Sequence, residues 1–95
     1  MITRLVKMTF RKEEIEQFKN IFAEKKAFIT AFSGCEKVNL FQDKNDERIF
    51  FTISIWQSEE ALENYRHSEL FRETWAATKV LFDDKPEAWS IDIVQ

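Results

Sequence analysis

Hydrophobic and polar residues alternate along residues 2–10, which is the pattern of a β-strand that is buried on one face. One face of this segment carries apolar side chains: Ile2, Val6, Met8 and Phe10. The other face is mostly polar, with Leu5 as the exception. We therefore expect a half-buried strand at the start of the fold.

A second alternation runs from Arg48 to Trp56, after the strand Cys35 to Gln42 and a turn at residues 43–46. One of its faces carries large apolar residues: Ile49, Phe51, Ile53 and Ile55. The other face mixes aromatic rings with two hydroxyls: Phe50, Thr52, Ser54 and Trp56. We expect the first face to be the core that packs against helices, and the second to be covered by another subunit.

Residues 12–31 repeat apolar side chains at the spacing of an amphipathic helix. The apolar stripe contains Ile15, Phe18, Phe22 and Ile29, widened by Ile21, Phe28 and Phe32. No good N-cap residue marks where this helix begins. Ser33-Gly34 marks its end, because glycine readily adopts the left-handed conformation that closes helices.

Two serines mark helix starts in close succession after Trp56. Ser58 and Ser68 are each followed by acidic residues, and a serine hydroxyl accepts hydrogen bonds from the free N–H groups of a first helical turn. We therefore expect a helical region that is broken near His67.

A last strand follows Lys85-Pro86 and alternates between residues 89 and 94. The element order is strand, helix, strand, strand, helix, strand. This βαββαβ order predicts an α+β, ferredoxin-like fold, in which helices cover one face of an antiparallel sheet. A single Gly and a single Pro leave no flexible linker, so residues 1–95 are expected to form one domain.

The aromatic content is high for so short a chain, with ten Phe and three Trp among 95 residues. A chain of this length buries only about 60–65% of its unfolded surface, whereas each aromatic ring buries about 150–250 Å². We expect some rings to face the second subunit of a homodimer, or to line a pocket for a small hydrophobic or aromatic molecule.

Charge and motifs exclude several classes of protein. The net charge of −3, with basic residues scattered among acids, argues against nucleic acid as a partner. No apolar run approaches the length needed to span a bilayer, and no signal peptide is evident, so we expect a soluble cytoplasmic protein and no membrane partner. One Cys and one His leave no ligand set for a structural metal, and no phosphate or dinucleotide loop is present. We expect no cofactor.

Two residues near the helix break are candidates for chemistry. His67 could act as a general acid or base, because an imidazole exchanges protons near neutral pH. Tyr65 could donate a hydrogen bond to a carbonyl or phenolate, or stack on a flat substrate. The alternatives are an exposed histidine at a kink and a tyrosine whose ring packs in the core.

Five further residues are candidates for the wall of a substrate pocket: Thr52, Trp56, Phe71, Trp75 and Asn39. The two tryptophans fit framework positions better than reacting ones, since Trp75 repeats at helical spacing with Phe71. Thr52 and Asn39 could face each other across the hairpin and add polar contacts.

The segment from Trp56 through Ser58 to Ser68-Glu69-Leu70-Phe71 resembles the antibiotic biosynthesis monooxygenase domain, a small dimeric α+β barrel. Ser33-Gly34-Cys35 before the second strand and Lys85-Pro86-Glu87-Ala88-Trp89 before the last are similar to that family as well. The resemblance implies a homodimer. For some members it implies oxidation of aromatic substrates by molecular oxygen without metal or flavin.

Two functions therefore follow as expectations. The first is a cofactor-independent monooxygenase that oxidises a small aromatic or quinol-like compound, with Tyr65 and His67 as its catalytic groups. The second is a non-catalytic dimeric barrel that binds a small hydrophobic ligand or serves as an interaction module. The haem-degrading branch of the superfamily is disfavoured, because Val6, Tyr65 and Trp75 stand where that branch has its Asn, Trp and His.

Overall fold

The computed structural model describes all 95 residues. Its four strands form one antiparallel sheet in the order β2-β3-β1-β4. The central strands are β1 (Ile2–Thr9) and β3 (Ile49–Trp56), and the outer ones are β2 (Cys35–Gln42) and β4 (Glu87–Ile91). The hairpin formed by β2 and β3 therefore lies where the sequence predicts it.

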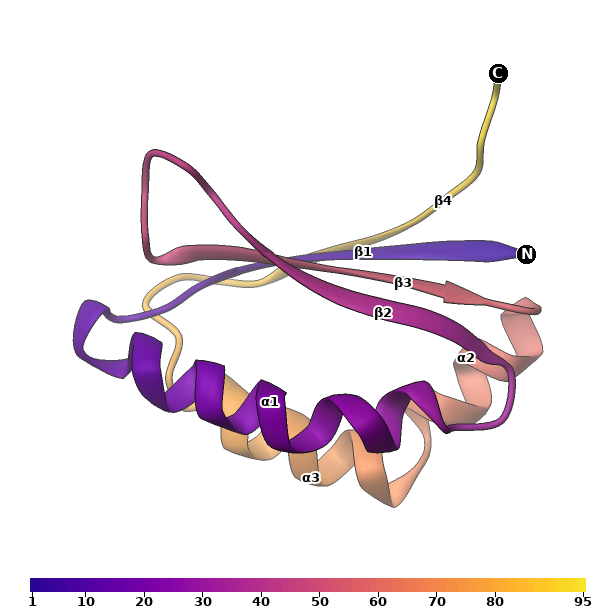
Figure 1. Ribbon diagram of the computed structural model, residues 1–95, viewed down its shortest axis with the longest axis horizontal. Coiled ribbons are helices and arrows are strands. Elements are labelled where there is room, and N and C mark those ends of the chain that lie inside the picture. The colour runs from indigo at the N-terminus through magenta and orange to yellow at the C-terminus, as the bar shows by residue number, and fades with distance from the viewer.

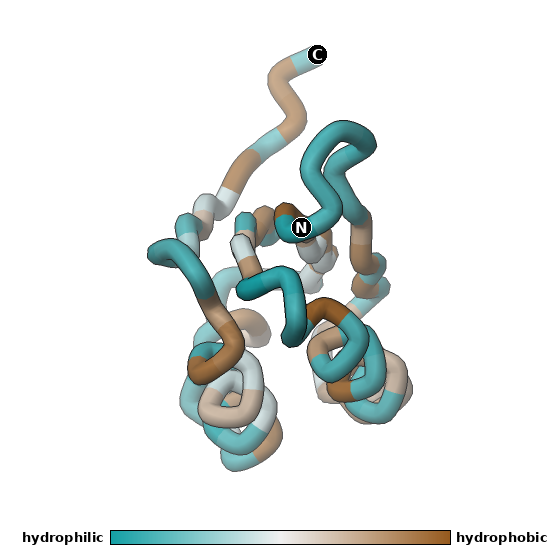
Figure 2. Tube along the Cα trace, turned by 90° about the vertical axis from the view of Figure 1, so that its left-hand side faces the viewer, coloured by the Kyte–Doolittle hydropathy of each residue, from teal (hydrophilic) through white to brown (hydrophobic).

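The helices all lie on one face of the sheet (Figure 1). A short 3-10 helix (Lys12–Glu14) leads into α1 (Ile15–Thr30), while α2 (Glu59–Arg66) and α3 (Glu69–Lys79) follow β3. Seen end on, two helical columns run side by side beneath the sheet (Figure 2), and α1 contacts α3. The predicted α+β, ferredoxin-like fold class is confirmed.

The two serine caps and the helix break between them are confirmed. The Ser58 hydroxyl accepts a hydrogen bond from the Ala61 N–H at 3.1 Å, and the Ser68 hydroxyl accepts one from the Phe71 N–H at 3.1 Å. His67 lies between the two helices as the C-cap of α2. The break redirects the chain, so that α3 crosses the sheet beside α1.

The assignment of the two sheet faces from the sequence is wrong. Phe50 and Trp56 are each 1% exposed and lie on the face that the helices cover, rather than on a face left for a partner. The register explains this, because Met8 pairs with Phe50 and Val6 with Thr52, so the apolar face of β1 continues into the mixed face of β3. The isoleucine-rich face of β3 is the open one.

Aromatic rings form the main core cluster. Phe10 is fully buried and stacks on Phe18, with 4.0 Å between ring centroids. Phe50 meets both rings edge to face, at 5.7 and 5.3 Å. Phe28, which the helical stripe placed with the core, is 62% exposed on the outer surface of α1. The buried stripe of α1 is therefore narrower than the sequence predicts.

The C-terminal strand ends earlier than the sequence predicts. β4 stops at Ile91, and residues 92–95 take no part in the sheet. This tail leaves the sheet on the side opposite the helices (Figure 1), and Ile93 and Val94 are more than 90% exposed. The alternation of residues 92–94 therefore does not correspond to paired strand.

Gly34 occupies a position that no other residue would fill without strain. Its φ is 88°, and a Cβ added there would collide with the Cβ of Ala61 on α2. We expect Gly34→Ala to lower the free energy of unfolding by about 2–4 kcal/mol, because the left-handed conformation and the overpacking both oppose it. Urea unfolding of the purified variant measures the loss.

The double variant Gly34→Ala/Ala61→Gly separates the two causes. Removing the Ala61 methyl group relieves the collision but leaves the positive φ, so the second change should recover part of the loss despite the usual cost of glycine in a helix. A Gly34→Ala protein as stable as the wild type would contradict this account of the turn.

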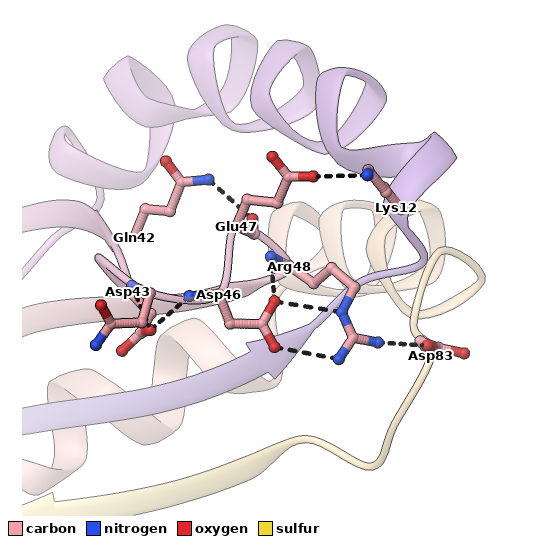
Figure 3. Close-up of polar contacts among 8 residues, drawn as sticks. Lys12, Gln42, Asp43, Asp46, Glu47, Arg48 and Asp83 are labelled. Atoms are coloured by element: carbon pink, nitrogen blue, oxygen red, sulfur yellow. Dashed lines mark hydrogen bonds and ion pairs between the residues drawn. The ribbon is translucent and has the colours of Figure 1, made fainter.

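A polar network holds the turn between β2 and β3 (Figure 3). The Asp43 carboxylate accepts hydrogen bonds from the backbone N–H groups of Asn45 and Asp46, at 2.9 and 2.8 Å. Arg48 pairs with Asp46 at 3.1 Å and with Asp83 at 2.8 Å, which ties the hairpin to the loop after α3. The hydrogen bonds from Arg48 lower the pKa of the Asp46 carboxyl.

Candidate functional site

A mostly apolar cavity lies between the sheet and the helices. Its volume is about 350 Å³, which falls within the range of pockets that hold small organic ligands. The sheet contributes residues from β1, β2 and β3, including Val6, Val38 and Thr52. From α1 come three apolar side chains: Phe18, Phe22 and Ile29.

A continuous row of aromatic rings from β3, α2 and α3 forms one wall of the cavity. Tyr65 stacks on Trp56 at 4.9 Å and meets Phe71 edge to face at 5.3 Å. Phe71 in turn stacks on Trp75 at 5.9 Å. All four residues line the cavity, and the break between α2 and α3 allows consecutive helices to contribute to one wall. The wall is suited to contact a flat aromatic molecule.

Few polar groups reach this cavity, and they differ in whether they have partners. The Ser54 hydroxyl accepts a hydrogen bond from Trp56 Nε1 at 2.9 Å, so it is engaged in the framework. The Thr78 hydroxyl donates to the Thr74 carbonyl at 2.7 Å. The Thr74 hydroxyl itself is buried and has no partner. Buried hydroxyls usually find one, so Thr74 is a candidate to bond a ligand or a water molecule.

Burial changes the acidity of Tyr65. Desolvation, followed by the negative charge of the nearby Cys35 once its thiol is ionised, raises the pKa of Tyr65 to about 12. The phenol is therefore neutral at physiological pH, where it is a hydrogen-bond donor and not a base. Burial likewise raises the pKa of the Cys35 thiol.

The single tyrosine of the chain makes this pKa directly measurable. We expect tyrosinate absorbance to appear near pH 12 in the folded protein and about two pH units lower in guanidinium, where the ordinary pKa of about 10 applies. The contribution of Tyr65 to the free energy of unfolding should be fully present below pH 10. It should be lost, by about 3 kcal/mol in all, as the pH rises from 10 through 12, because the unfolded chain releases the proton first. Identical titrations of both states would contradict the burial of the phenol.

The charged residues of the cavity come from β1, α2 and β4. They are Arg4, Arg66 and Glu87, of which Arg4 is half-buried and the other two are exposed. Arg66 Nη1 donates to Glu63 at 2.9 Å, and Glu87 lies 4.0 Å from Lys7. These residues give one side of an otherwise apolar cavity a polar character.

The structure brings together five of the seven predicted site residues: Tyr65, Thr52, Trp56, Phe71 and Trp75. His67 is not among the cavity-lining residues. Its side chain is 79% exposed, and its Nε2 lies 3.2 Å from Glu63 on the outer surface of α2. Asn39 also lies outside the cavity, because it pairs with Ile53 on the open face of the sheet.

Arg4, Thr74 and Thr78 are among the cavity residues that were not predicted from the sequence, although two patterns point to them. Arg4 follows Ile2 by two residues and precedes Val6 by two, so strand alternation places a charge among apolar side chains. Thr74 and Thr78 repeat with Phe71 and Trp75 at helical spacing, which places their hydroxyls on the buried side of α3.

A second hollow lies over the β2–β3 turn, and it is lined entirely by polar residues, among them Lys12 and Glu47. These side chains mainly satisfy one another, as the network around Arg48 shows (Figure 3). The structure contains no group of His, Cys, Asp and Glu residues able to hold a metal ion, and no helix long and apolar enough to cross a membrane.

Comparison with known proteins shows the family to which the chain belongs. The sequence model of the family described as antibiotic biosynthesis monooxygenase matches residues 1–77. The chain belongs to this family. No curated protein matches the sequence.

Solved structures of similar fold include several related to this family. A structure described as an antibiotic biosynthesis monooxygenase has a TM-score of 0.93 at 19% identity, with 100% of both chains covered. SnoaB, a cofactor-independent oxygenase from Streptomyces nogalater, has a TM-score of 0.88 at 18% identity, covering 99% of this chain and 93% of its own. A protein from Methanosarcina mazei has a TM-score of 0.89 at 20% identity, covering 96% and 91%. At these identities the likeness extends to the fold alone.

Proposed function

We propose that the protein is a cofactor-independent monooxygenase that oxidises a small aromatic or quinol-like compound with molecular oxygen. The observation that carries the proposal is the Tyr65 phenol, which is a desolvated, neutral donor within an aromatic wall of the cavity. Membership of the monooxygenase family and the fold shared with a cofactor-independent oxygenase support the reaction class.

The proposed chemistry draws its electrons from the substrate. A quinol that loses a proton becomes an electron-rich anion that can react with dioxygen. One oxygen atom enters the ring at a C–H position as a hydroxyl, the ring is oxidised to a quinone, and the second oxygen atom leaves as water with the two phenolic hydrogens. The four electrons that dioxygen accepts all come from the substrate, so no external reductant is consumed.

The side chains of the cavity provide binding, shape and hydrogen bonding in this scheme. Tyr65 donates a hydrogen bond to the substrate oxyanion, which stabilises the deprotonated form that reacts with oxygen. The rings of Phe71 and Trp75 hold the substrate by stacking, and Thr74 offers an unused hydroxyl nearby. The apolar surroundings exclude water and strengthen each of these hydrogen bonds.

Oxygen consumption with a panel of quinols tests the proposal. We expect protein-dependent uptake of oxygen, with one atom of isotopically labelled dioxygen in the product and the other in water. Boiled protein and protein-free samples correct for spontaneous oxidation. No acceleration with any aromatic substrate, combined with tight binding of the same compounds, would favour the alternative of a non-catalytic barrel that binds a small hydrophobic ligand.

We also propose that the protein is a homodimer joined through the open face of the sheet. Leu5, Ile53 and Trp89 are cross-strand neighbours on this face, and Trp89 is 42% exposed. The exposed tail with Ile93 and Val94 leaves on the same side (Figure 1). A twofold dimer buries one such apolar patch on both subunits at once.

Replacing Ile53 with Lys should therefore convert the dimer to a monomer at micromolar concentration, because the interface would then bury an unpaired charge beside Leu5. Sedimentation velocity measures the change. Phe28→Lys is the matched control, since Phe28 is exposed on the outer surface of α1 and its replacement should leave the dimer intact. A monomeric wild-type protein would contradict the assembly.

A further inference from the structure

Arg4 is a charged residue on the cavity side of β1. It pairs with Ser54 of β3 and with Ser90 of β4, so both of its neighbours across the sheet are serines. Arg4 Nη1 donates a hydrogen bond to the Ser90 hydroxyl at 3.2 Å. The residue lines the cavity together with the aromatic wall.

The ion pairs of the protein leave Arg4 without a carboxylate. Three other arginines have one, at 3.6 Å for Arg11, 2.8 Å for Arg48 and 2.9 Å for Arg66. Arg72 lies on the surface, and its Nη1 donates to the His67 carbonyl. Of the two arginines that line the cavity, Arg66 is paired with a carboxylate and Arg4 is not. The Arg4 guanidinium is therefore free to form a charged hydrogen bond with a ligand.

The electrostatic surroundings of Arg4 favour an added negative charge. Partial burial and the neighbouring Arg66 guanidinium both lower the pKa of Arg4, whereas Glu63 opposes them. Glu63 is already hydrogen-bonded to Arg66 at 2.9 Å, and Glu87 is exposed beside Lys7. A bound anion would therefore compensate a charge that the protein itself leaves unpaired.

We propose that Arg4 is the anion-binding residue of the cavity, and that its ligand is an aromatic compound carrying a carboxylate. The planar guanidinium can bind a carboxylate with two parallel hydrogen bonds, while the aromatic wall contacts the ring. A fused bicyclic aromatic acid is smaller than the cavity of about 350 Å³. This assignment rests on the proposed function only in naming its substrate class.

Calorimetric binding of three matched probes tests the charge requirement. The probes are 2-naphthoate, naphthalene-2-carboxamide and 2-naphthol, which share a ring system and differ in the group presented to Arg4. We expect 2-naphthoate to bind about 10- to 100-fold more tightly than the two neutral probes at neutral pH, the range for hydrogen bonds to charged groups. Equal affinities, or no binding of 2-naphthoate at millimolar concentration, would overturn the proposal.

Two variants then assign the effect to Arg4. Arg4→Gln should lose the same factor for 2-naphthoate and leave the carboxamide unchanged, and Arg4→Lys should retain part of it because the charge stays while the paired geometry is lost. Arg72→Gln, a surface arginine that also lacks a carboxylate partner, should bind like the wild type. Melting temperatures confirm that each variant is folded. Full affinity in Arg4→Gln would refute the role.

A comparison of two quinols separates this inference from the monooxygenase proposal. Oxygen uptake is measured with naphthalene-1,4-diol and with its 2-carboxylate. If both are oxidised with equal KM, the monooxygenase proposal stands and the role of Arg4 falls. If the acid binds tightly through Arg4 but neither compound is oxidised, the binding site stands and the monooxygenase proposal falls.

Discussion

Tyr65→Phe is expected to lower the turnover of a quinol substrate by about 10²- to 10³-fold, the usual effect of removing one oxyanion donor. The Tyr65 ring packs against Trp56, Phe32 and Phe71, at centroid distances of 4.9, 5.4 and 5.3 Å. Phenylalanine preserves all three contacts and removes only the hydroxyl. The loss should therefore appear in kcat, measured by oxygen consumption, while the melting temperature changes little.

The matched control for this prediction is His67→Ala. His67 is two residues away in the sequence, but its side chain is 79% exposed and lies outside the cavity. Its removal should leave turnover within about twofold of the wild type, as expected for a surface site. Equal turnover in Tyr65→Phe and the wild type would remove the phenol from the mechanism. A collapse of activity in His67→Ala would return the imidazole to it.

Local signals in the sequence predicted the helices and the hairpin well. The caps at Ser58 and Ser68 work through hydrogen bonds to nearby backbone groups, so they can be read without knowing the tertiary structure. The same holds for Gly34, although it does not cap α1, whose C-cap is Ala31. Its φ of 88° belongs to the turn closed by the hydrogen bond from the Cys35 N–H to the Phe32 carbonyl, where glycine is the residue that local turn chemistry favours. Helix ends and turns that depend on such local contacts can therefore be predicted from neighbouring residues in the sequence.

The choice of buried face depends on strand pairing, which a single strand does not reveal. Both faces of β3 are apolar enough to form a core, and its sequence alone favours the isoleucine-rich face. Pairing with β1 determines which face of β3 is buried. Met8 pairs with Phe50, so the apolar side of β1 and the mixed side of β3 both face the helices.

The site residues that follow helical periodicity could be predicted from the sequence. A residue whose role depends on where its side chain points could not. Tyr65, Phe71 and Trp75 share one wall because the helix break turns α3 against α2. His67 is the C-cap of α2, and its imidazole folds back towards Glu63, four residues earlier, rather than into the cavity. A residue at a break can point either way, so sequence position alone did not determine its direction.

Phe10→Ala is expected to lower the free energy of unfolding by about 3–5 kcal/mol, the range for a fully buried phenylalanine. Phe10 is 0% exposed, and it contacts the rings of Phe18, Phe50 and Phe82 at 4.0, 5.7 and 5.3 Å. Its ring therefore joins α1, β3 and the segment after α3. Small domains have only about 5–15 kcal/mol of stability in total, so the variant should be close to unfolding.

Urea unfolding followed by tryptophan fluorescence measures this loss, and Phe28→Ala is the matched control. Both variants remove the same atoms, but Phe28 is 62% exposed, so its replacement should change the free energy of unfolding by no more than about 0.5 kcal/mol. The difference between the two isolates the contribution of burial. Equal effects at the two positions would mean that the ring cluster around Phe10 does not form the core, because exposure would then not determine the loss.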